Sequence, residues 1–168
     1  KSINAALKMS EQGDGGRVIA RDLSDYKVAL IDENIKRLNI TNIQTQVYNA
    51  LDCDESLINK ADIVIADLPC SGLGIIGRKP DIKYNASLEK LQSLVELQRD
   101  ILKVVSRYVK SGGVLMYSTC TINRAENEDN ADWICKEAGF TKDGEYHQLL
   151  PANNSGMDGF FVARLIKN

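Results

Sequence analysis

The chain has 168 residues, of which 43% are hydrophobic and 26% are charged, so it is long enough to bury one core and does not have the composition of a disordered protein. Its apolar runs are short and its first residues form no apolar signal core, which argues against a membrane span or a secretory leader and leads us to expect a soluble, cytoplasmic protein. The net charge of -2 gives no overall sign of nucleic-acid binding, so any attraction to RNA must be local.

Hydrophobic periodicity predicts a helix that ends at Gly13, followed by a turn at positions 14–16 and a strand at positions 17–22. Ser24 is a suitable N-cap for a second helix, whose apolar face includes Val28, Ile31 and Ile35. Positions 43–48 predict the next strand.

Positions 62–68 form a nearly continuous apolar run, typical of a strand that helices cover on both faces. A loop rich in Gly, Pro and basic residues follows from position 69 to about 85. Ser87 then caps a long helix, which we expect Gly112 and Gly113 to end.

A further strand is predicted at positions 114–118. Asn123 and Glu126 have the spacing of a capping box, which would open a helix that runs to Gly139. In the tail, positions 140–149 and 160–166 suit an antiparallel pair of strands, separated by the Gly- and Asn-rich stretch 153–159.

Strands that alternate with helices predict an α/β fold with a mostly parallel sheet, whose ligands bind at the carboxyl ends of the strands. The polar residues at these ends are Asp22, Asn49, Asp67 and the group Ser118 to Cys120. A carboxylate such as that of Asp22 suits ribose hydroxyls, although a lone strand-end aspartate is also a common turn or cap residue.

Two of the four cysteines follow predicted strands. Cys70 lies in the segment D-L-P-C-S-G-L-G, and Cys120 lies in Y-S-T-C-T just before a predicted helix, whose N-terminus would stabilise a thiolate. For Cys53 and Cys135 we expect the ordinary role of a small buried hydrophobic residue. The chain has no C-x-x-C pair and one histidine, His147, so it predicts neither a disulfide framework nor a metal site.

These segments resemble the RsmB (Fmu/Sun) family of 16S ribosomal RNA cytosine-5 methyltransferases, and the resemblance covers essentially the whole chain. The family's D-x-P-C-S-G-x-G and P-D-I-K segments match positions 67–83. Its S-T-C-S/T-x-x-x-x-E-N-E segment matches positions 118–128, and its D-G-F-F-x-A-x-L/F segment matches positions 158–165.

The resemblance implies a Rossmann-like fold of the class I type, S-adenosylmethionine as cofactor and RNA as substrate. Cytosine C5 is a weak nucleophile, so a thiolate adds at C6 and creates an enamine. The family assigns this role to the residue matching Cys120, and assistance in release to the one matching Cys70. Asp67 would hydrogen-bond the cytosine edge or face the cofactor. Cofactor contacts are expected from Asp22, Asn49, Asp67 and Lys1, and RNA contacts from Arg78, Lys79, Lys83 and Arg124.

Lys1 and Ser2 match the last two positions of the family's cofactor loop, A-x-P-G-G-K-S/T. We therefore expect a single methyltransferase domain over residues 1–168 that is a fragment, without its glycine loop, its central first strand and an N-terminal RNA-binding region. Such a fragment should bind S-adenosylmethionine weakly or not at all. Asn49 also departs from the aspartate that the family usually has near the adenine.

Two alternatives remain open from the sequence. The motifs do not separate a methyltransferase for ribosomal RNA from one for another RNA, such as transfer RNA. A noncatalytic α/β module that binds RNA or a protein is the hypothesis from a different class.

Overall fold

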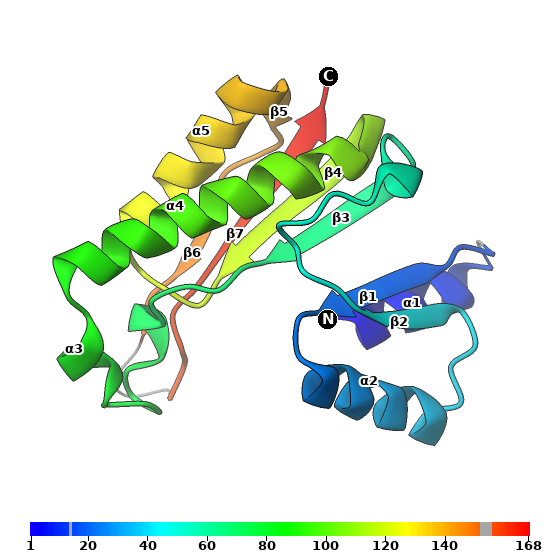
Figure 1. Ribbon diagram of the computed structural model, residues 1–168, viewed down its shortest axis with the longest axis horizontal. Coiled ribbons are helices and arrows are strands. Elements are labelled where there is room, and N and C mark those ends of the chain that lie inside the picture. The colour runs from blue at the N-terminus through cyan, green and yellow to red at the C-terminus, as the bar shows by residue number, and fades with distance from the viewer. Residues whose placement is uncertain (14, 152–155) are drawn as a thin grey trace. The chain divides into compact units, whose positions relative to one another are not determined.

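The computed structural model describes residues 1–13, 15–151 and 156–168, and its contacts divide them into two compact units, Lys1–Asp52 and Cys53–Asn168 (Figure 1). Position 14 of the predicted turn and positions 153–155 of the predicted Gly- and Asn-rich stretch lie outside the described residues. Among the described residues, no helix is both long enough and apolar enough to cross a membrane.

The first unit is a parallel pair of strands with two helices, and it follows the predicted elements closely. Gly13 ends the first helix in the left-handed region, at φ 69°, and the Ser24 side chain accepts a hydrogen bond from the backbone N–H of Lys27, as an N-cap does. The elements are α1 (Ser2–Gln12), β1 (Val18–Asp22), α2 (Asp25–Arg37) and β2 (Ile43–Val47).

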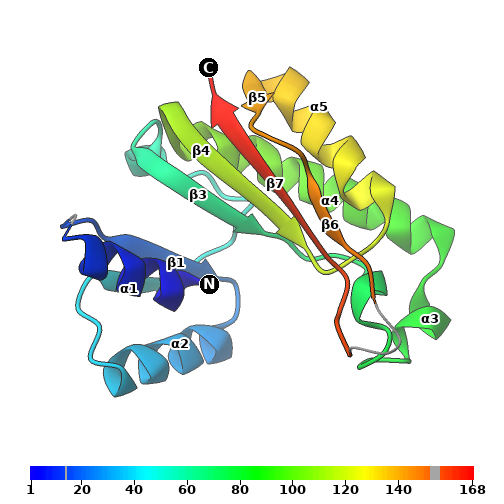
Figure 2. The ribbon, with the colours of Figure 1, turned by 180° about the vertical axis from the view of Figure 1, so that it is seen from behind.

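The second unit is a mixed sheet with two long helices, α4 and α5, side by side on one face (Figures 1 and 2). The strand order is β3-β4-β7-β5, and β6 also pairs with β7. Strands β3 and β4 are parallel, whereas β7 is antiparallel to each of its partners. The strands are β3 (Ala61–Asp67), β4 (Val109–Thr119), β5 (Phe140–Lys142), β6 (His147–Leu149) and β7 (Phe160–Lys167). The helices are α3 (Ile82–Asn85), α4 (Leu88–Val105) and α5 (Glu128–Ala138), and four short 3-10 helices cover Glu55–Leu57, Leu73–Ile75, Ser106–Tyr108 and Arg124–Glu126.

The prediction that Gly112 and Gly113 end the long helix is wrong. Helix α4 stops at Val105, and β4 already begins at Val109, so both glycines lie within the strand. The pairing with β3 shifts register between Ala61 and Ile63, and Gly112 has a φ of 72°, as an irregularity in a strand often requires. An apolar Val109 fits a helical face as well as a strand, which explains the error.

Two other predictions need correction in detail. The expected strand at positions 140–149 is broken into β5 and β6, which pair with opposite ends of β7. The second unit covers only one face of β3 with its own helices, because Ile63 and Ile65 point to the other face and are 61% and 47% exposed.

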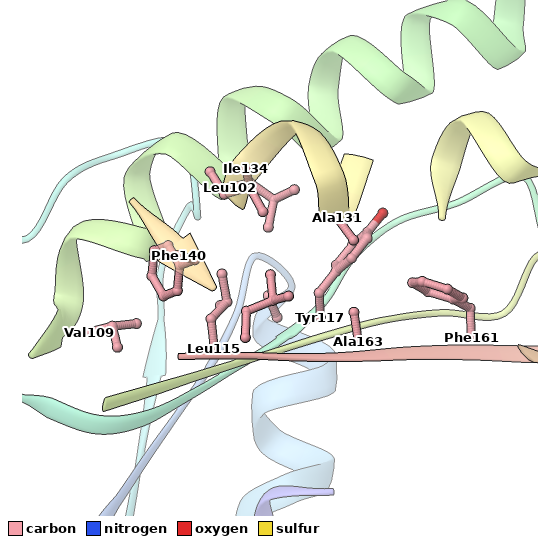
Figure 3. Close-up of a cluster of buried hydrophobic side chains, with 11 residues drawn as sticks. Leu102, Val109, Leu115, Tyr117, Ala131, Ile134, Phe140, Phe161 and Ala163 are labelled. Carbon is pink, nitrogen blue, oxygen red and sulfur yellow. The ribbon is translucent and has the colours of Figure 1, made fainter. Parts of the chain in front are cut away.

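The core of the second unit fills the space between the sheet and the two helices (Figure 3). Tyr117 of β4 and Phe161 of β7 are fully buried and meet edge to face, with ring centroids 6.0 Å apart. Leu102 of α4 and Ile134 of α5 are also fully buried against them. Each such side chain contributes about 1.5–3 kcal/mol by leaving water, so this core holds β4 firmly in place.

The loop after β3 meets the segment before β7 through two glycines. The Gly159 N–H donates to the Gly74 carbonyl at 2.7 Å, and a Cβ at Gly74 would lie 2.5 Å from the Gly159 oxygen and 2.8 Å from the Cys120 oxygen. Gly74 does not have a positive φ. The position therefore needs glycine for close backbone packing rather than for conformation.

We expect Gly74→Ala to destabilise the protein by about 2 kcal/mol or more, because the methyl group meets backbone atoms that cannot rotate away. Gly77→Ala is the matched control, since a Cβ there meets nothing within 4 Å. Denaturant unfolding followed by circular dichroism measures both variants. Equal midpoints for the two would show that the loop after β3 yields easily.

Candidate active site

The two thiols that follow β3 and β4 lie in contact. Parallel pairing places Asp67 opposite Ser118, so the chain segments that leave the two strands start side by side. The Cys70 and Cys120 sulfurs are 3.1 Å apart, and the Cys120 backbone N–H donates to the Cys70 sulfur at 3.3 Å. Both side chains are half-buried, so they remain open to a substrate.

The carboxylate of Asp67 is held at the same edge of the sheet. It accepts a hydrogen bond from the Ser118 hydroxyl at 2.9 Å, while the backbone N–H of Leu68 donates to the Ser118 carbonyl at 3.2 Å. Asp67 itself is exposed. The structure therefore brings together the three residues for which a catalytic role was predicted.

Direct contacts join the two segments beyond the cysteines. The hydroxyls of Ser71 and Thr121 are 2.8 Å apart, and the Gly74 N–H donates to the Cys120 carbonyl at 3.1 Å. These bonds tie each cysteine to the segment that presents the other. The thiols thus belong to one rigid arrangement of two loops.

A fully buried carboxylate, that of Glu126, lies between these segments. It accepts hydrogen bonds from the Ser71 N–H at 2.9 Å, from the Asn123 amide at 3.0 Å and from the Gln98 amide at 3.0 Å. The predicted capping box is right for Asn123 and wrong for Glu126. The Asn123 side chain caps the 3-10 helix Arg124–Glu126 by accepting from the Ala125 N–H at 3.2 Å. The Asn123 N–H donates to the Thr121 hydroxyl rather than to Glu126, and helix α5 begins only at Glu128.

Gln98 belongs to no motif that the sequence predicts to be functional, and the sequence predicts a capping role for Glu126 that the structure does not show. A signal for Gln98 was present, because it interrupts the apolar face of α4 four residues before Leu102. A polar side chain at such a position must find partners inside the protein. Glu126 lies within the family segment at positions 118–128, but its spacing from Asn123 favours a helix cap.

A cavity of about 180 Å³ opens beside Cys70. Ser71, Asp81 and Lys90 form its polar wall, and its apolar wall comes from α3 and the first half of α4. Cys70 therefore borders a partly apolar space.

The environment of Cys70 favours its neutral form. A hydrogen bond to Cys120, burial and repulsion from the neighbouring sulfur together raise the pKa of Cys70 far above that of an ordinary thiol. Cys70 therefore keeps its proton at neutral pH. Its S–H group is then available to donate toward the Cys120 sulfur.

The remaining cysteines show no comparable arrangement in the described part of the chain. Cys135 packs against the hydrophobic core, and burial raises its pKa. Cys53 is half-buried. We therefore still interpret Cys53 and Cys135 as structural residues.

The predicted cofactor residues other than Asp67 lie in the first unit. Asp22 and Asn49 follow adjacent parallel strands, and the Tyr48 N–H donates to the Asp22 carbonyl at 2.9 Å. The Asp22 carboxylate accepts from the Ser24 N–H at 2.9 Å and lies 3.6 Å from the Lys27 ammonium. The Asn49 side-chain oxygen accepts from the Leu51 N–H at 3.1 Å, which leaves its amide N–H groups as donors. Lys1 is the exposed N-cap residue of α1.

The predicted RNA-binding residues fall into two groups. Arg78 pairs with Asp158 at 3.1 Å, and Arg124 pairs with Asp129 at 3.0 Å. Lys79 and Lys83 are exposed, and the Lys83 ammonium lies 5.4 Å from the ring centroid of Tyr84, which is 83% exposed. The lysines thus present positive charge close to the cavity beside Cys70.

Comparison with known proteins identifies close relatives. A family model described as 16S rRNA methyltransferase RsmB/F matches residues 5–166. A probable ribosomal RNA small subunit methyltransferase B from Bacillus subtilis is 35% identical over 99% of this chain and 40% of its own length. A ribosomal RNA small subunit methyltransferase F from Escherichia coli O157:H7 is 31% identical over 99% of this chain and 38% of its own length. The chain thus spans about two fifths of these relatives.

Solved structures agree with the sequence relatives. The crystal structure of PH0851 has a TM-score of 0.83 and 30% identity, over 90% of this chain and 37% of that one. The structure of NSun6 from Pyrococcus horikoshii with SFG has a TM-score of 0.75 and 26% identity, over 90% of this chain and 41% of that one. The predicted Rossmann-like α/β fold of a class I methyltransferase, with antiparallel strands at its C-terminus, is confirmed.

We expect Cys120→Ala to lower the pKa of Cys70, because the substitution removes the hydrogen bond that raises it most. Burial persists, so the pKa stays above that of a free thiol. Initial rates of iodoacetamide alkylation, mapped by mass spectrometry, should rise at lower pH for Cys70 in the variant, with Cys135 as the internal control. Identical pH profiles for Cys70 in both proteins would contradict the coupling.

Proposed function

The chain belongs to the RsmB/F family of 16S rRNA methyltransferases, and on that premise we propose that it is the catalytic part of an enzyme that methylates C5 of cytosine in ribosomal RNA. The observation that supports this most directly is the contact between two thiols, 3.1 Å apart, beside a carboxylate at the end of a parallel sheet. A cytosine C5 needs a nucleophile at C6 and a base at C5, and a thiol pair offers both.

Cys120 is the nucleophile in this proposal. Its thiolate adds to C6, the new S–C6 bond forms, and the electron pair of the C5–C6 double bond moves into the ring so that C5 becomes an enamine carbon. The Cys70 S–H, whose raised pKa keeps it protonated, stabilises the neighbouring thiolate by hydrogen bonding. In this proposal Cys120 is the thiol of the pair that ionises.

Cys70 acts in the release step. Once Cys120 is bonded to C6, it no longer offers an acceptor thiolate, so the interaction that most raises the Cys70 pKa is gone. Cys70 can then release its own proton to solvent, and the resulting thiolate takes the C5 proton. The C5–H electron pair restores the C5–C6 double bond and expels the Cys120 thiolate. The adduct thus raises the fraction of Cys70 that is present as thiolate at the stage that needs a base.

Asp67 orients the base. Its carboxylate is exposed and held by the Ser118 hydroxyl, and it can accept a hydrogen bond from the cytosine amino group. This contact fixes the ring with C6 toward the sulfurs. It also favours the electron shift that accompanies addition.

S-adenosylmethionine supplies the electrophilic methyl group when bound. The residues of the first unit fit its nucleoside part: the carboxylate of Asp22 can accept hydrogen bonds from a ribose diol, and the free amide N–H groups of Asn49 can donate to an adenine nitrogen. Lys1 and Asp67 are the further contacts that we propose.

RNA binding relies on local charge, because the chain as a whole carries a net charge of -2. Lys79 and Lys83 are the principal phosphate contacts that we propose, since they are exposed and flank Asp81 and Ile82, which line the cavity beside Cys70. Arg78 and Arg124 contribute less, because each already lies beside a carboxylate.

We expect Cys70→Ala to accumulate a denaturant-stable complex with 16S rRNA in the presence of S-adenosylmethionine, because the Cys120 adduct forms but is released slowly. The complex should vanish in the double variant Cys70→Ala/Cys120→Ala and should not form with Cys135→Ala. Gel electrophoresis of labelled RNA under denaturing conditions measures it. A Cys120→Ala protein that keeps its function would instead favour a noncatalytic module, and trapping on transfer RNA alone would change the substrate.

We also expect Lys79→Ala/Lys83→Ala to weaken RNA binding and to reduce the slope of log K against log salt by about 1.4, or about 0.7 for each phosphate contact on a single strand. Lys103→Ala is the control, because Lys103 lies near the other end of α4 and pairs with Asp100. Fluorescence anisotropy over a range of salt concentrations gives both slopes. An unchanged slope in the double variant would place the RNA elsewhere.

A further inference from the structure

Gln98 is a fully buried amide on the face of α4 that packs against the core. A buried carboxamide costs free energy unless its polar atoms are hydrogen-bonded. Its N–H groups donate to the Pro69 carbonyl at 2.9 Å and to the Glu126 carboxylate at 3.0 Å, and its oxygen accepts from the Asn130 amide at 2.8 Å. Both ends of the carboxamide are therefore satisfied.

Two partners of Gln98, Pro69 and Glu126, hold the segment that carries Cys70. Pro69 immediately precedes Cys70, and Glu126, which Gln98 contacts, accepts from the N–H of Ser71, which immediately follows Cys70. The backbone on both sides of Cys70 is thus held by one pair of buried side chains, Gln98 and Glu126.

The same pair is anchored to the segment that follows Cys120. The other Glu126 oxygen accepts from the Asn123 amide, and the Glu126 carbonyl accepts a hydrogen bond from the buried Tyr117 hydroxyl. Asn127, the next residue, accepts from the Thr119 hydroxyl at 2.5 Å and donates to the Thr121 carbonyl at 3.0 Å. The Thr119 side chain and the Thr121 backbone, on either side of Cys120, are thus held by the residue that follows Glu126.

From this arrangement we propose that Gln98 is a positioning residue that, through Glu126, sets the distance between the Cys70 and Cys120 sulfurs. The proposal rests on the proposed function, because the distance matters only if the two thiols act on one base. Misplacing a reacting group by about 1 Å costs up to about 100-fold in rate, so a side chain that fixes two segments has a large effect without touching the substrate.

The test measures the thiol geometry directly, without RNA. In a background with Cys53→Ser and Cys135→Ser, oxidised glutathione converts the two thiols into a disulfide and is itself reduced to two molecules of glutathione. The equilibrium gives the effective concentration of one thiol at the other, which is high only if the sulfurs, 3.1 Å apart, can reach the bonded distance of about 2.05 Å without strain.

We expect Gln98→Met to lower this effective concentration by about tenfold or more, because methionine fills the same space but removes the amide that donates to Pro69 and Glu126. Asp100→Met is the matched control on the same helix. Asp100 is exposed and pairs with Lys103 of α4, so its loss should leave the exchange equilibrium unchanged.

Glu126 supplies the second pair of variants. Glu126→Gln keeps an oxygen that accepts from Ser71 and Gln98, and should retain most of the effective concentration. Glu126→Ala removes both links and should lower it as Gln98→Met does. Circular dichroism shows whether each variant is folded, and all thiol exchange is measured well below the melting temperature. If Gln98→Met does not fold, Glu126→Ala tests the proposal in its place.

A folded Gln98→Met or Glu126→Ala protein with the wild-type effective concentration would overturn the proposal. In methylation assays the same variants should lower kcat with little change in KM for RNA, because the phosphate contacts are untouched. Failure of the proposed function has a different signature: no Cys120 adduct with RNA forms in the Cys70→Ala protein, whatever the glutathione equilibrium shows.

Discussion

The parallel pairing of β3 with β4 is the constraint on which the site depends. With Asp67 opposite Ser118, both chains leave the sheet at the same edge, and the two thiols follow within three residues of the strand ends. A shift of one residue in the register of β3 against β4 would turn the side chains of β3 to the opposite face of the sheet. Asp67 and Cys70 would then be separated from Cys120. The buried rings of Tyr117 and Phe161, which pack β4 and β7 against the helices, hold that register.

Two physical devices then convert neighbouring strand ends into sulfur contact. The absence of side chains at Gly74 and Gly159 lets three backbone segments approach to distances that no Cβ would permit. Beneath them, the buried carboxylate of Glu126 is satisfied by donors from α4, from the segment after Cys70 and from the segment after Cys120. A buried charge is unfavourable unless its hydrogen bonds are complete, so the network tolerates only one arrangement of the segments.

In the mechanism that we propose, one contact serves two stages of a reaction. Before the adduct forms, the neighbouring Cys120 raises the pKa of Cys70 and keeps it protonated. Bond formation at Cys120 would remove that influence and lower the pKa of Cys70, so that more of it is thiolate when a base is needed. The change in role follows from the contact itself, so it requires no movement of the backbone.

Local patterns were sufficient for most of the elements and for the chemistry-bearing residues. Hydrophobic period located the strands, Ser24 and Ser87 fulfilled their predicted capping roles, and Asp67, Cys70 and Cys120 were recognised because reactive groups stand at strand ends and in motifs. The same reasoning failed where one pattern fits two environments: Val109 suits a helix or a strand, and the Asn123 to Glu126 spacing suits a cap or an inward-facing carboxylate. Residue identity and spacing thus determined which groups are present and at which edge of the sheet they gather. Only the tertiary structure decided that Glu126 turns inward to Gln98 and how closely the two sulfurs meet, because both depend on hydrogen bonds between segments distant in the chain.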